Sequence, residues 1–281
     1  MPRPEKNTWP NGARIAVVLQ VPFEVWSGHS SSLATVPQLP DERVAAGERD
    51  LLTESFRRYA GEVGMWRLID LLDRHGVPAT GVFSGKAAED YPDVARTFLE
   101  GALGREIAAH SWTQDTFTYD LDDESMRDNI RRTAAAIEAA SGQRPVGWVD
   151  AGGLFVASTL RLLAEEGFLY HGAYAHSDTA EVVEAAGRPI VQMSVPWDVN
   201  DYLQYVQSYN PPSHFVEIFT RSFDVLYEDG GQIVGAVAHA GVYGHAFGIS
   251  AYDEVIRYAK AHDDVWITSR REIAEWVLAQ R

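Results

Sequence analysis

The sequence predicts an α/β fold made of parallel βαβ units, with a barrel of about seven strands as the most economical architecture. Short apolar runs rich in β-branched residues alternate along the chain with longer segments of 3.6-residue periodicity. No change of composition marks a linker, and 281 residues with 46% apolar content can bury one full core. We therefore expect residues 1–281 to form a single domain. A doubly wound open sheet is the rival architecture, but no GxGxxG motif follows the first apolar run.

Seven of the apolar runs are typical of buried strands because they are short, β-branched and almost without charge. They cover residues 15–21, 79–84, 105–111, 147–151, 189–195, 232–239 and 265–269.

Three of the periodic segments predict amphipathic helices over residues 63–76, 124–142 and 157–168. A glycine at or near the end of each one (Gly76, Gly142 and Gly167) supplies the usual signal for a helix C-terminus. Residues 22–50 are the exception to the alternation and predict a long loop after the first strand. In a βα barrel that end of the strand carries the active site, so the loop is expected to be functional.

Composition excludes several classes of function. The formal net charge of −16 repels phosphate backbones and anionic lipid headgroups, so neither nucleic acid nor a membrane surface is an expected partner. There is no cysteine, which excludes disulfides, thiolate nucleophiles and thiolate metal ligands. The N-terminal residues lack the apolar region of a signal peptide, and no stretch reaches the roughly 18 apolar residues of a membrane span. We expect a cytoplasmic protein that acts on a small molecule.

Ionisable residues recur where five of the predicted strands end. They are Glu24, the run 110–115 that starts with His110, Asp150, the run 197–201, and His239. Because parallel strands of a barrel place their C-terminal ends at one mouth, these residues are expected to meet in an active site. A barrel with only a structural role has no reason to repeat such groups at one end.

Each of the four candidate catalytic residues also has a structural interpretation. His110 follows the apolar run IAA and can be a satisfied core histidine, and Asp150 in WVDAGG can be a turn former. His239 precedes the glycine-spaced loop AGVYGHAFG, which lets backbone approach a ligand. Glu24 can be a surface carboxylate, but its apolar neighbours predict a raised pKa that suits proton transfer.

The chain resembles the polysaccharide deacetylase (NodB-homology) family, in particular its intracellular allantoinase-like branch. The similarity rests on motifs in the same order and spacing along nearly the whole chain, namely WPNGARIAVVL, ESFRRYAGEVGMWRLIDLLDRHGVPAT, REIAAHSW, SGQRPVGW, TLRLLAEEGFLY, SFDVLYEDG and HDDVWITSRREIAEW. This resemblance implies a distorted (β/α)7 barrel and a hydrolase of amide-like carbon–nitrogen bonds.

The family's catalytic motifs are altered in this sequence. Only Glu24 remains near the acidic motif of the first strand, where Pro22 and Phe23 stand in place of carboxylates. His110 matches the first histidine of the family's HxxxH pair, but the second position is Gln114. The arginine motif of the fourth strand becomes residues 149–152 without arginine, whereas His239 and Ala240 keep the histidine of the His-Pro pair.

A divalent metal such as zinc could use Glu24, His110 and Gln114 as ligands. Catalytic zinc requires three nitrogen or oxygen donors from the protein, and a neutral amide oxygen is a far weaker ligand than imidazole. The joint change of three motifs therefore favours a site without metal, with the metal site kept as the alternative.

Three functions follow from these residues. The first is a hydrolase of a small amide, cyclic imide or ureide, in which Glu24 takes a proton from water and His239 protonates the leaving nitrogen. The second is a metal-independent acid–base enzyme (hydrolase, decarboxylase or carbon–carbon lyase) acting on an aromatic or carbonyl compound. The third is a non-catalytic protein that binds a ligand.

Expected substrate-binding residues are Phe23, Trp26, Trp112, Gln114, Trp148, Trp197, Asp198 and Tyr243. The 22–50 loop and residues 201–215 are expected to contact further copies of the chain in a homo-oligomer.

Overall fold

The computed structural model describes residues 6–27 and 36–281, so the part of the predicted 22–50 loop at 28–35 lies outside the described residues. One curled sheet contains all the strands that the description covers, in the order β6-β7-β5-β4-β3-β2-β1-β8, with β9 also paired to β1. The strands are β1 (Ile15–Phe23), β2 (Thr80–Phe83), β3 (Glu106–Ala109), β4 (Gly147–Trp148), β5 (Tyr170–Tyr174), β6 (Glu181–Ala185), β7 (Arg188–Ser194), β8 (Gln232–Val237) and β9 (Val265–Thr268).

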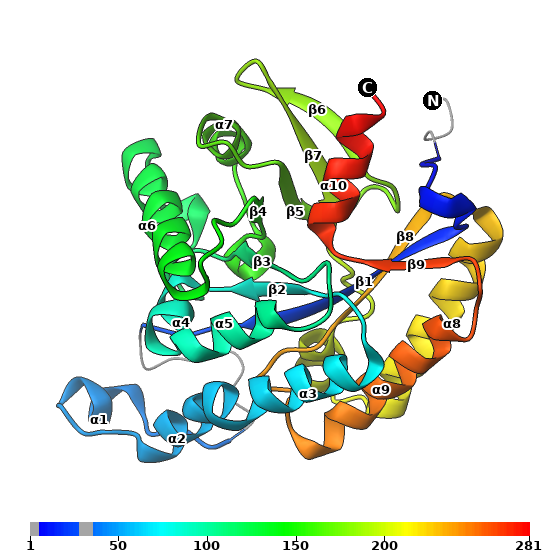
Figure 1. Ribbon diagram of the computed structural model, residues 1–281. Coiled ribbons are helices and arrows are strands. Elements are labelled where there is room, and N and C mark those ends of the chain that lie inside the picture. The colour runs from blue at the N-terminus through cyan, green and yellow to red at the C-terminus, as the bar shows by residue number, and fades with distance from the viewer. Residues whose placement is uncertain (1–5, 28–35) are drawn as a thin grey trace.

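Strand β1 lies in the middle of the curled part of the sheet and has a neighbour on each edge (Figure 1). Along one edge β1 pairs with β8, and along the other it pairs first with β9 and then with β2. All these pairings are parallel, and only the β6–β7 pair is antiparallel. A parallel bridge between Asn200, which follows β7, and Val237 of β8 brings the two ends of the order together. The result confirms the predicted distorted (β/α)7 barrel, with β6 and β9 added to it.

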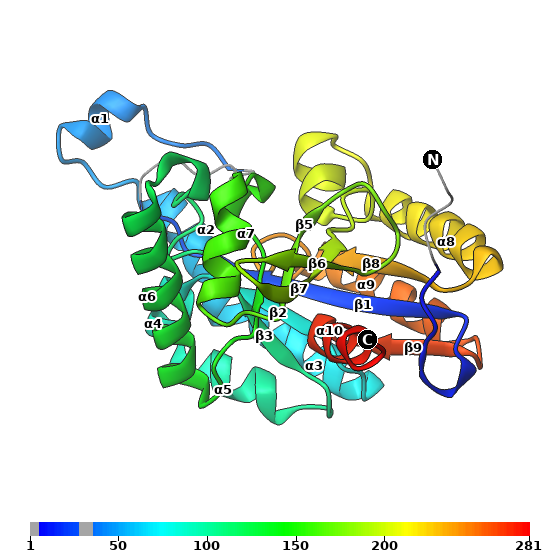
Figure 2. The same ribbon diagram turned by 90° about the horizontal axis from the view of Figure 1, so that it is seen from above.

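Most helices cover the outside of the curled sheet (Figures 1 and 2), whereas the last one, α10, packs on the inward-facing cluster that contains Ala16 and Val18. The helices are α1 (Asp41–Ala45), α2 (Leu51–Tyr59), α3 (Met65–His75), α4 (Gly85–Asp90), α5 (Pro92–Glu100), α6 (Asp123–Ser141), α7 (Ala157–Glu165), α8 (Pro212–Asp229), α9 (Ala246–Lys260) and α10 (Arg270–Ala279). A π-helical turn at Ala60–Gly64 joins α2 to α3, so the helix predicted at 63–76 is part of a longer helical run. The predicted glycine ends are confirmed, with Gly76, Gly142 and Gly167 all at positive φ.

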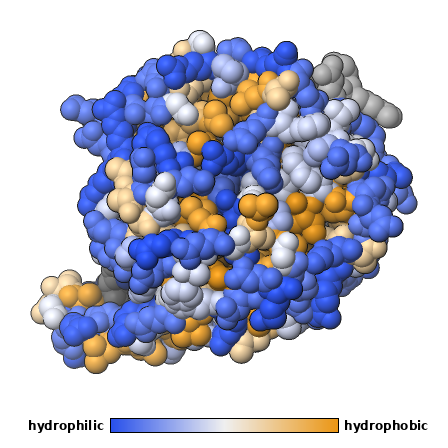
Figure 3. All heavy atoms as spheres, in the orientation of Figure 1, coloured by the Kyte–Doolittle hydropathy of each residue, from blue (hydrophilic) through white to orange (hydrophobic). Residues whose placement is uncertain are grey.

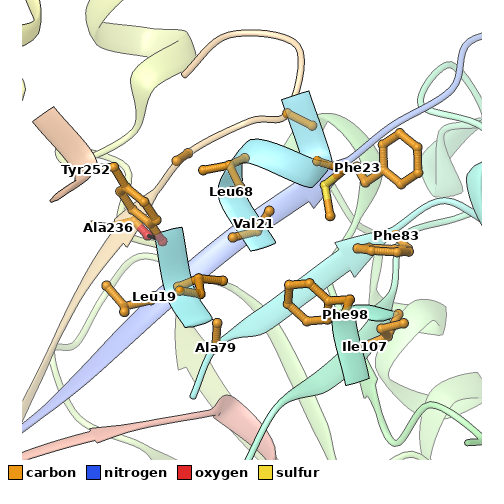
Figure 4. Packing of buried hydrophobic residues seen from close by; sticks show 14 of the residues in the cluster. Leu19, Val21, Phe23, Leu68, Ala79, Phe83, Phe98, Ile107, Ala236 and Tyr252 are labelled. Carbon is orange, nitrogen blue, oxygen red and sulfur yellow. Dashed lines mark hydrogen bonds between the residues drawn. The ribbon is translucent and has the colours of Figure 1, made fainter. Parts of the chain in front are cut away.

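Strand β1 shows why the core has two parts. All nine of its residues are buried, as expected for a parallel strand covered on both faces. Successive side chains point to opposite faces, so Leu19, Val21 and Phe23 pack outwards against helices, whereas Ala16 and Val18 face the barrel interior. Figure 4 shows the outer cluster between β1, β2 and β3 and the helices α3, α5 and α9. Each large apolar side chain buried there contributes roughly 1.5–3 kcal/mol.

Two strands have no counterpart among the predicted runs. Strand β5 has the sequence YHGAY, in which polar and aromatic residues replace the apolar run, and β6 is only partly buried. Tyr170 can lie in the barrel because Gly147 of β4 has no side chain: a Cβ there would fall 1.8 Å from the Tyr170 ring. The predicted 147–151 strand is accordingly reduced to two residues of β4.

The outer surface is mainly polar on the face shown in Figure 3, in agreement with the excess of acidic residues. Helix α1 projects away from the body in both ribbon views and buries none of its residues. Nearby on α2, Leu51 and Leu52 are 64% and 48% exposed. Over residues 6–27 and 36–281, no helix is both long and apolar enough to cross a lipid bilayer.

Candidate active site

Three of the residues predicted from the sequence meet at the C-terminal mouth of the barrel. Glu24 follows β1, His110 follows β3 and His239 follows β8. The Oε1 atom of Glu24 lies 3.3 Å from Nε2 of His110 and 3.5 Å from Nε2 of His239. All three side chains are at least nine-tenths buried. The predicted juxtaposition is therefore confirmed, and one carboxylate oxygen stands between two imidazoles.

Backbone pairing explains how these side chains come together. Hydrogen bonds from Ala238 N to Gln20 O and from Ala240 N to Pro22 O carry the β1–β8 pairing past the strand ends and so hold His239 beside Glu24. His110 is followed by Ser111 at a positive φ of 58°, which turns the chain sharply after β3.

His239 is held by Asp201, a residue that the sequence placed in the strand-end run 197–201 without a role. Asp201 is fully buried, and its Oδ1 lies 2.5 Å from Nδ1 of His239. Its Oδ2 accepts hydrogen bonds from the backbone N–H groups of His239 and Tyr243, at 2.8 and 3.1 Å. A carboxylate can only accept here, so Nδ1 of His239 carries a hydrogen and Nε2 is directed to Glu24. The position of Asp201 after a predicted strand was the only indication of its importance. Its pairing with His239 could not be predicted from the sequence.

Opposite charges set the protonation states of this pair. Burial would lower the pKa of His239, but the carboxylates of Asp201 and Glu24 outweigh it and raise the pKa to about 10. Burial would likewise raise the pKa of Glu24, but the charge on His239 and the contacts with both histidines lower it to about 2. The expectation of a raised pKa for Glu24 is therefore wrong, because its neighbours are imidazoles as well as apolar groups.

His110 presents a free lone pair when neutral. Its Nδ1 lies 2.7 Å from the carbonyl oxygen of Val149, which can only accept, so Nδ1 carries the hydrogen. Nε2 is buried and makes no hydrogen bond of good geometry with any described residue, although Glu24 lies 3.3 Å away. This nitrogen is positioned to take a proton from a molecule in the site.

A cavity of about 460 Å³ opens onto the three residues. Besides Nε2 of His110 and Oε2 of Glu24, two polar atoms of lining residues are buried without a partner in the described structure: Oε1 of Gln114, which accepts, and Nε1 of Trp26, which donates. Neither lysine nor arginine is found among the described residues that line it, and the aromatic rings of Trp26, Phe117, Trp197 and Tyr202 form much of the rest. The volume and the few convergent polar groups suit a small organic ligand.

Asp150 lines the same cavity but has structural partners. Its Oδ1 accepts from the Thr118 hydroxyl at 2.9 Å and from Trp148 Nε1 at 3.1 Å, and its Oδ2 pairs with Nε2 of His171. Both Asp150 and His171 are almost completely buried. A carboxylate engaged on both oxygens has little capacity for proton transfer, so the catalytic expectation for Asp150 is corrected to a structural role.

The predicted substrate-binding residues divide into two groups. Trp26, Gln114 and Trp197 line the cavity, and Phe23 lines a neighbouring cavity of about 200 Å³ on the other side of Glu24. The remaining four lie outside the main cavity, because neighbouring residues at a strand end point in different directions: they are Trp112 stacked on Arg132, Trp148 buried below Asp150, exposed Asp198, and Tyr243 packed on Phe215. The expectation for these four is corrected.

The donors present do not fit the metal ion that the resemblance implies. No group of three histidine, aspartate or glutamate side chains within residues 6–27 and 36–281 can hold a metal ion. The proposed ligand set therefore depends on the neutral amide of Gln114, which is a poor zinc ligand. Glu24 is in contact with both imidazoles, so protons on these rings can balance its charge.

Comparisons with known proteins agree with the fold and the motifs. Residues 60–171 match the family described as polysaccharide deacetylase. The peptidoglycan deacetylase-like protein FGM2 of Gibberella zeae is 29% identical over 157 residues, 55% of this chain and 44% of FGM2, so the match spans less than half of that protein. A putative polysaccharide deacetylase of Schizosaccharomyces pombe is 24% identical over 96% of this chain and 92% of its own length. The crystal structure of Puue allantoinase superposes with a TM-score of 0.86 at 27% identity, covering 99% of this chain and 95% of that one.

Proposed function

Since this chain belongs to the polysaccharide deacetylase family, we propose that it hydrolyses a carbon–nitrogen bond in a small amide, cyclic imide or ureide. One observation carries the proposal: the carboxylate of Glu24 lies between two imidazoles whose Nδ1 atoms are both committed to other acceptors. Both Nε2 atoms therefore face the buried Oε1 atom of Glu24. The Nε2 atom of His110 can take a proton, and the Nε2 atom of His239 can give one. Hydrolysis of an amide bond requires both transfers.

The first step uses His110 as the general base. A water molecule in the cavity gives a proton to Nε2 of His110 while its oxygen bonds to the substrate carbonyl carbon. The low pKa of Glu24 makes this carboxylate a poor base, so it acts by stabilising the imidazolium that forms on His110. Nε1–H of Trp26 is available to donate to the carbonyl oxygen as negative charge develops there.

The second step uses His239 as the general acid. Its Nε2 gives a proton to the leaving nitrogen as the carbon–nitrogen bond breaks, and Asp201 keeps the ring oriented. Glu24 stays ionised throughout, with the positive charge on His239 before the reaction and on His110 after it. Return of the proton from His110 to His239 restores the enzyme, and the products are a carboxylic acid and an amine. No step in this scheme depends on a metal ion.

The cavity supports an uncharged planar substrate. No lysine or arginine is found among its described lining residues, and the positive charge of His239 is already paired with Asp201 and Glu24. Gln114 Oε1 would accept a hydrogen bond from a substrate N–H. Aromatic walls suit a flat amide or imide ring. The structural neighbour named as an allantoinase supports the same class of bond, although it does not identify the substrate of this chain.

The proposal is tested by measuring ring opening or amine release from a panel of cyclic imides, ureides and N-acetyl amides. The variants His110→Asn and His239→Asn are each expected to lose activity by about 10²–10⁴-fold. His214→Asn is the matched control, because this residue lies on α8 with 42% of its side chain exposed, away from the cavity. Activity that survives in the His239→Asn variant would contradict the proposed acid.

Metal dependence is tested in the same assay. We expect activity to persist after prolonged chelation and not to rise when zinc, cobalt or manganese is added. Loss on chelation with recovery on adding zinc would replace the scheme by a metal-assisted one through Glu24, His110 and Gln114. Inertness on the whole panel combined with tight ligand binding would favour the non-catalytic alternative.

A further inference from the structure

A further cavity lies beside the candidate active site and is distinct both from it and from the cavity of about 200 Å³ lined by Phe23. Its volume is about 160 Å³, which is room for several water molecules or one small organic molecule. Only Val195 and Trp197 line both this cavity and that of the candidate active site. This further cavity is formed by the end of β7 and the residues after it, the first half of β8, the segment before β6, one side of α8 and the first residue of α10, Arg270.

Arg270 is the unusual feature of this cavity. The residue is only 1% exposed. The charge of the buried Glu106 acts on its guanidinium, but Arg270 makes no direct ion pair with a carboxylate among the described residues. Its Nε donates to Gln20 Oε1 at 3.1 Å and its Nη2 to the carbonyl oxygen of Ser194 at 2.8 Å. Nη1 is buried and has no hydrogen-bond partner among the residues that the structure describes.

A buried cation of this kind stays costly when the only anion acting on it is not in direct contact, because neutral acceptors replace only part of its hydration. Arginine stays charged at any pH that proteins tolerate, so the guanidinium cannot escape the penalty by losing its proton. A planar carboxylate is the group that matches its donors best. The structure therefore points to a ligand whose anionic end reaches the wall formed by Arg270.

The exposed side of the cavity has the opposite charge. Asp178 and Asp198 both line it and both are exposed. Partial burial, followed by repulsion from Asp198 and Asp229, raises the pKa of Asp178. A simple anion would have to pass these two carboxylates, and a simple cation would meet Arg270 inside. A molecule with a positive group near the rim and a carboxylate within satisfies both charges.

We propose that this cavity binds a small zwitterion of the amino acid class, with its carboxylate on Arg270 and its ammonium group between Asp178 and Asp198. The walls between the two charged ends are largely apolar and suit a short hydrocarbon segment: Val18, Ala175, Pro196, Val199, Leu226 and Val234. The site is separate from the catalytic residues and does not rest on the proposed hydrolase activity.

Calorimetric titration tests the proposal with glycine and 4-aminobutyrate, which differ in the spacing of their charges, and with acetate and methylammonium as half-ligands. At least one zwitterion should bind saturably with one site per chain, and each half-ligand should bind about 10-fold more weakly or worse. The complex should form equally well with the His239→Asn variant, because the active site is not used.

Substitutions at the rim separate this site from nonspecific binding. The double variant Asp178→Asn and Asp198→Asn should weaken zwitterion binding by about 10-fold or more, since each lost charge removes part of a charge-assisted contact. Asp93→Asn is the control, because Asp93 is 76% exposed on α5 and lies away from the cavity. Arg270→Lys should also weaken zwitterion binding. If the Arg270→Lys variant does not fold, the double variant at Asp178 and Asp198 still tests the proposal. Absence of saturable binding, binding unchanged in the rim variant, or binding lost in His239→Asn would each overturn the proposal.

Discussion

At the scale of single residues, the proposed mechanism depends on one carboxylate that stays ionised throughout. Glu24 has a depressed pKa because His239 carries a positive charge beside it, and Asp201 helps to keep that charge in place. In the proposed mechanism, the two histidines therefore transfer the protons, and Glu24, which the sequence suggested as the base, does not. Loss of either carboxylate is expected to lower the pKa of His239, because both raise it.

The pH profile of activity gives a direct check of this arrangement. The acid form of His239 persists until about pH 10, so kcat should not fall through loss of that proton until the pH approaches 10. The Asp201→Asn variant loses the nearest carboxylate, and the alkaline fall of kcat should move down by ~1 pH unit or more. An unchanged alkaline limb in Asp201→Asn would show that His239 is not the acid.

A second prediction concerns Glu24. Replacing it by glutamine keeps the shape but removes the negative charge that both imidazolium forms require. We expect Glu24→Gln to lower kcat by about 10²-fold or more, with a smaller effect on KM. The alkaline limb should also move to lower pH, since Glu24 contributes to the raised pKa of His239. A variant that keeps full kcat would remove Glu24 from the mechanism.

At the scale of elements, helix α10 is docked on the barrel through a buried carboxylate. Oε1 of Glu106, in β3, accepts from the Thr80 hydroxyl at 2.9 Å, from the Tyr170 hydroxyl at 3.0 Å and from the backbone N–H of Arg271 at 2.7 Å. Oε2 is buried without a partner. Burial outweighs these hydrogen bonds and raises the pKa of Glu106 to about 7.

This raised pKa predicts a pH-dependent loss of stability. The folded protein binds the Glu106 proton more tightly than the unfolded chain does, so the free energy of unfolding decreases as the pH rises from about 4.5 to 7. The contribution of this one group amounts to about 3 kcal/mol. In Glu106→Gln that contribution is absent, so the variant should gain stability relative to the parent between pH 5 and pH 8 in urea unfolding. Glu89→Gln, on the exposed side of α4, is the control and should show no such change.

The elements also show what the sequence could and could not predict. Strands β1, β7 and β8 were recognisable because a parallel strand covered on both faces must be apolar throughout, and the helix ends at Gly76 and Gly142 were recognisable because only glycine adopts those backbone angles easily. Strand β5 was missed because Tyr170 fills space left by Gly147, a complementarity between residues distant in sequence.

The same distinction applies to the site. Position after a strand was enough to predict that Glu24, His110 and His239 would meet. Their protonation states depend on which atom faces which neighbour, and this follows only from the three-dimensional contacts with Asp201 and Val149. Asp150 was overvalued for the same reason, since its partner His171 lies on a strand that the sequence did not reveal.

At the scale of the whole molecule, the excess of negative charge is the dominant feature. The chain has 40 acidic and 24 basic residues, so many surface carboxylates have no cation to pair with. Exposed ion pairs contribute little, about 0–1 kcal/mol each, whereas repulsion among the excess negative charges acts over the whole surface. Self-repulsion should therefore outweigh the ion pairs in the response to salt.

Added sodium chloride is accordingly expected to stabilise the protein. Raising the concentration from about 0.1 M towards 1 M shortens the screening length from about 10 Å to 3 Å. A gain of about 1 kcal/mol would raise the unfolding midpoint by ~2–4 °C for a domain of this size. Thermal unfolding followed by circular dichroism at both concentrations measures the shift. A midpoint that falls with salt would mean that ion pairs matter more than net repulsion.

The position of β1 has a consequence for how the molecule is made. Its neighbours include β8 and β9, which lie more than 200 residues further along the chain. During synthesis the first strand to leave the ribosome must wait, with its apolar faces uncovered, until nearly all the rest has been translated. A newly made chain of this protein is thus expected to depend on chaperones until its last strand arrives.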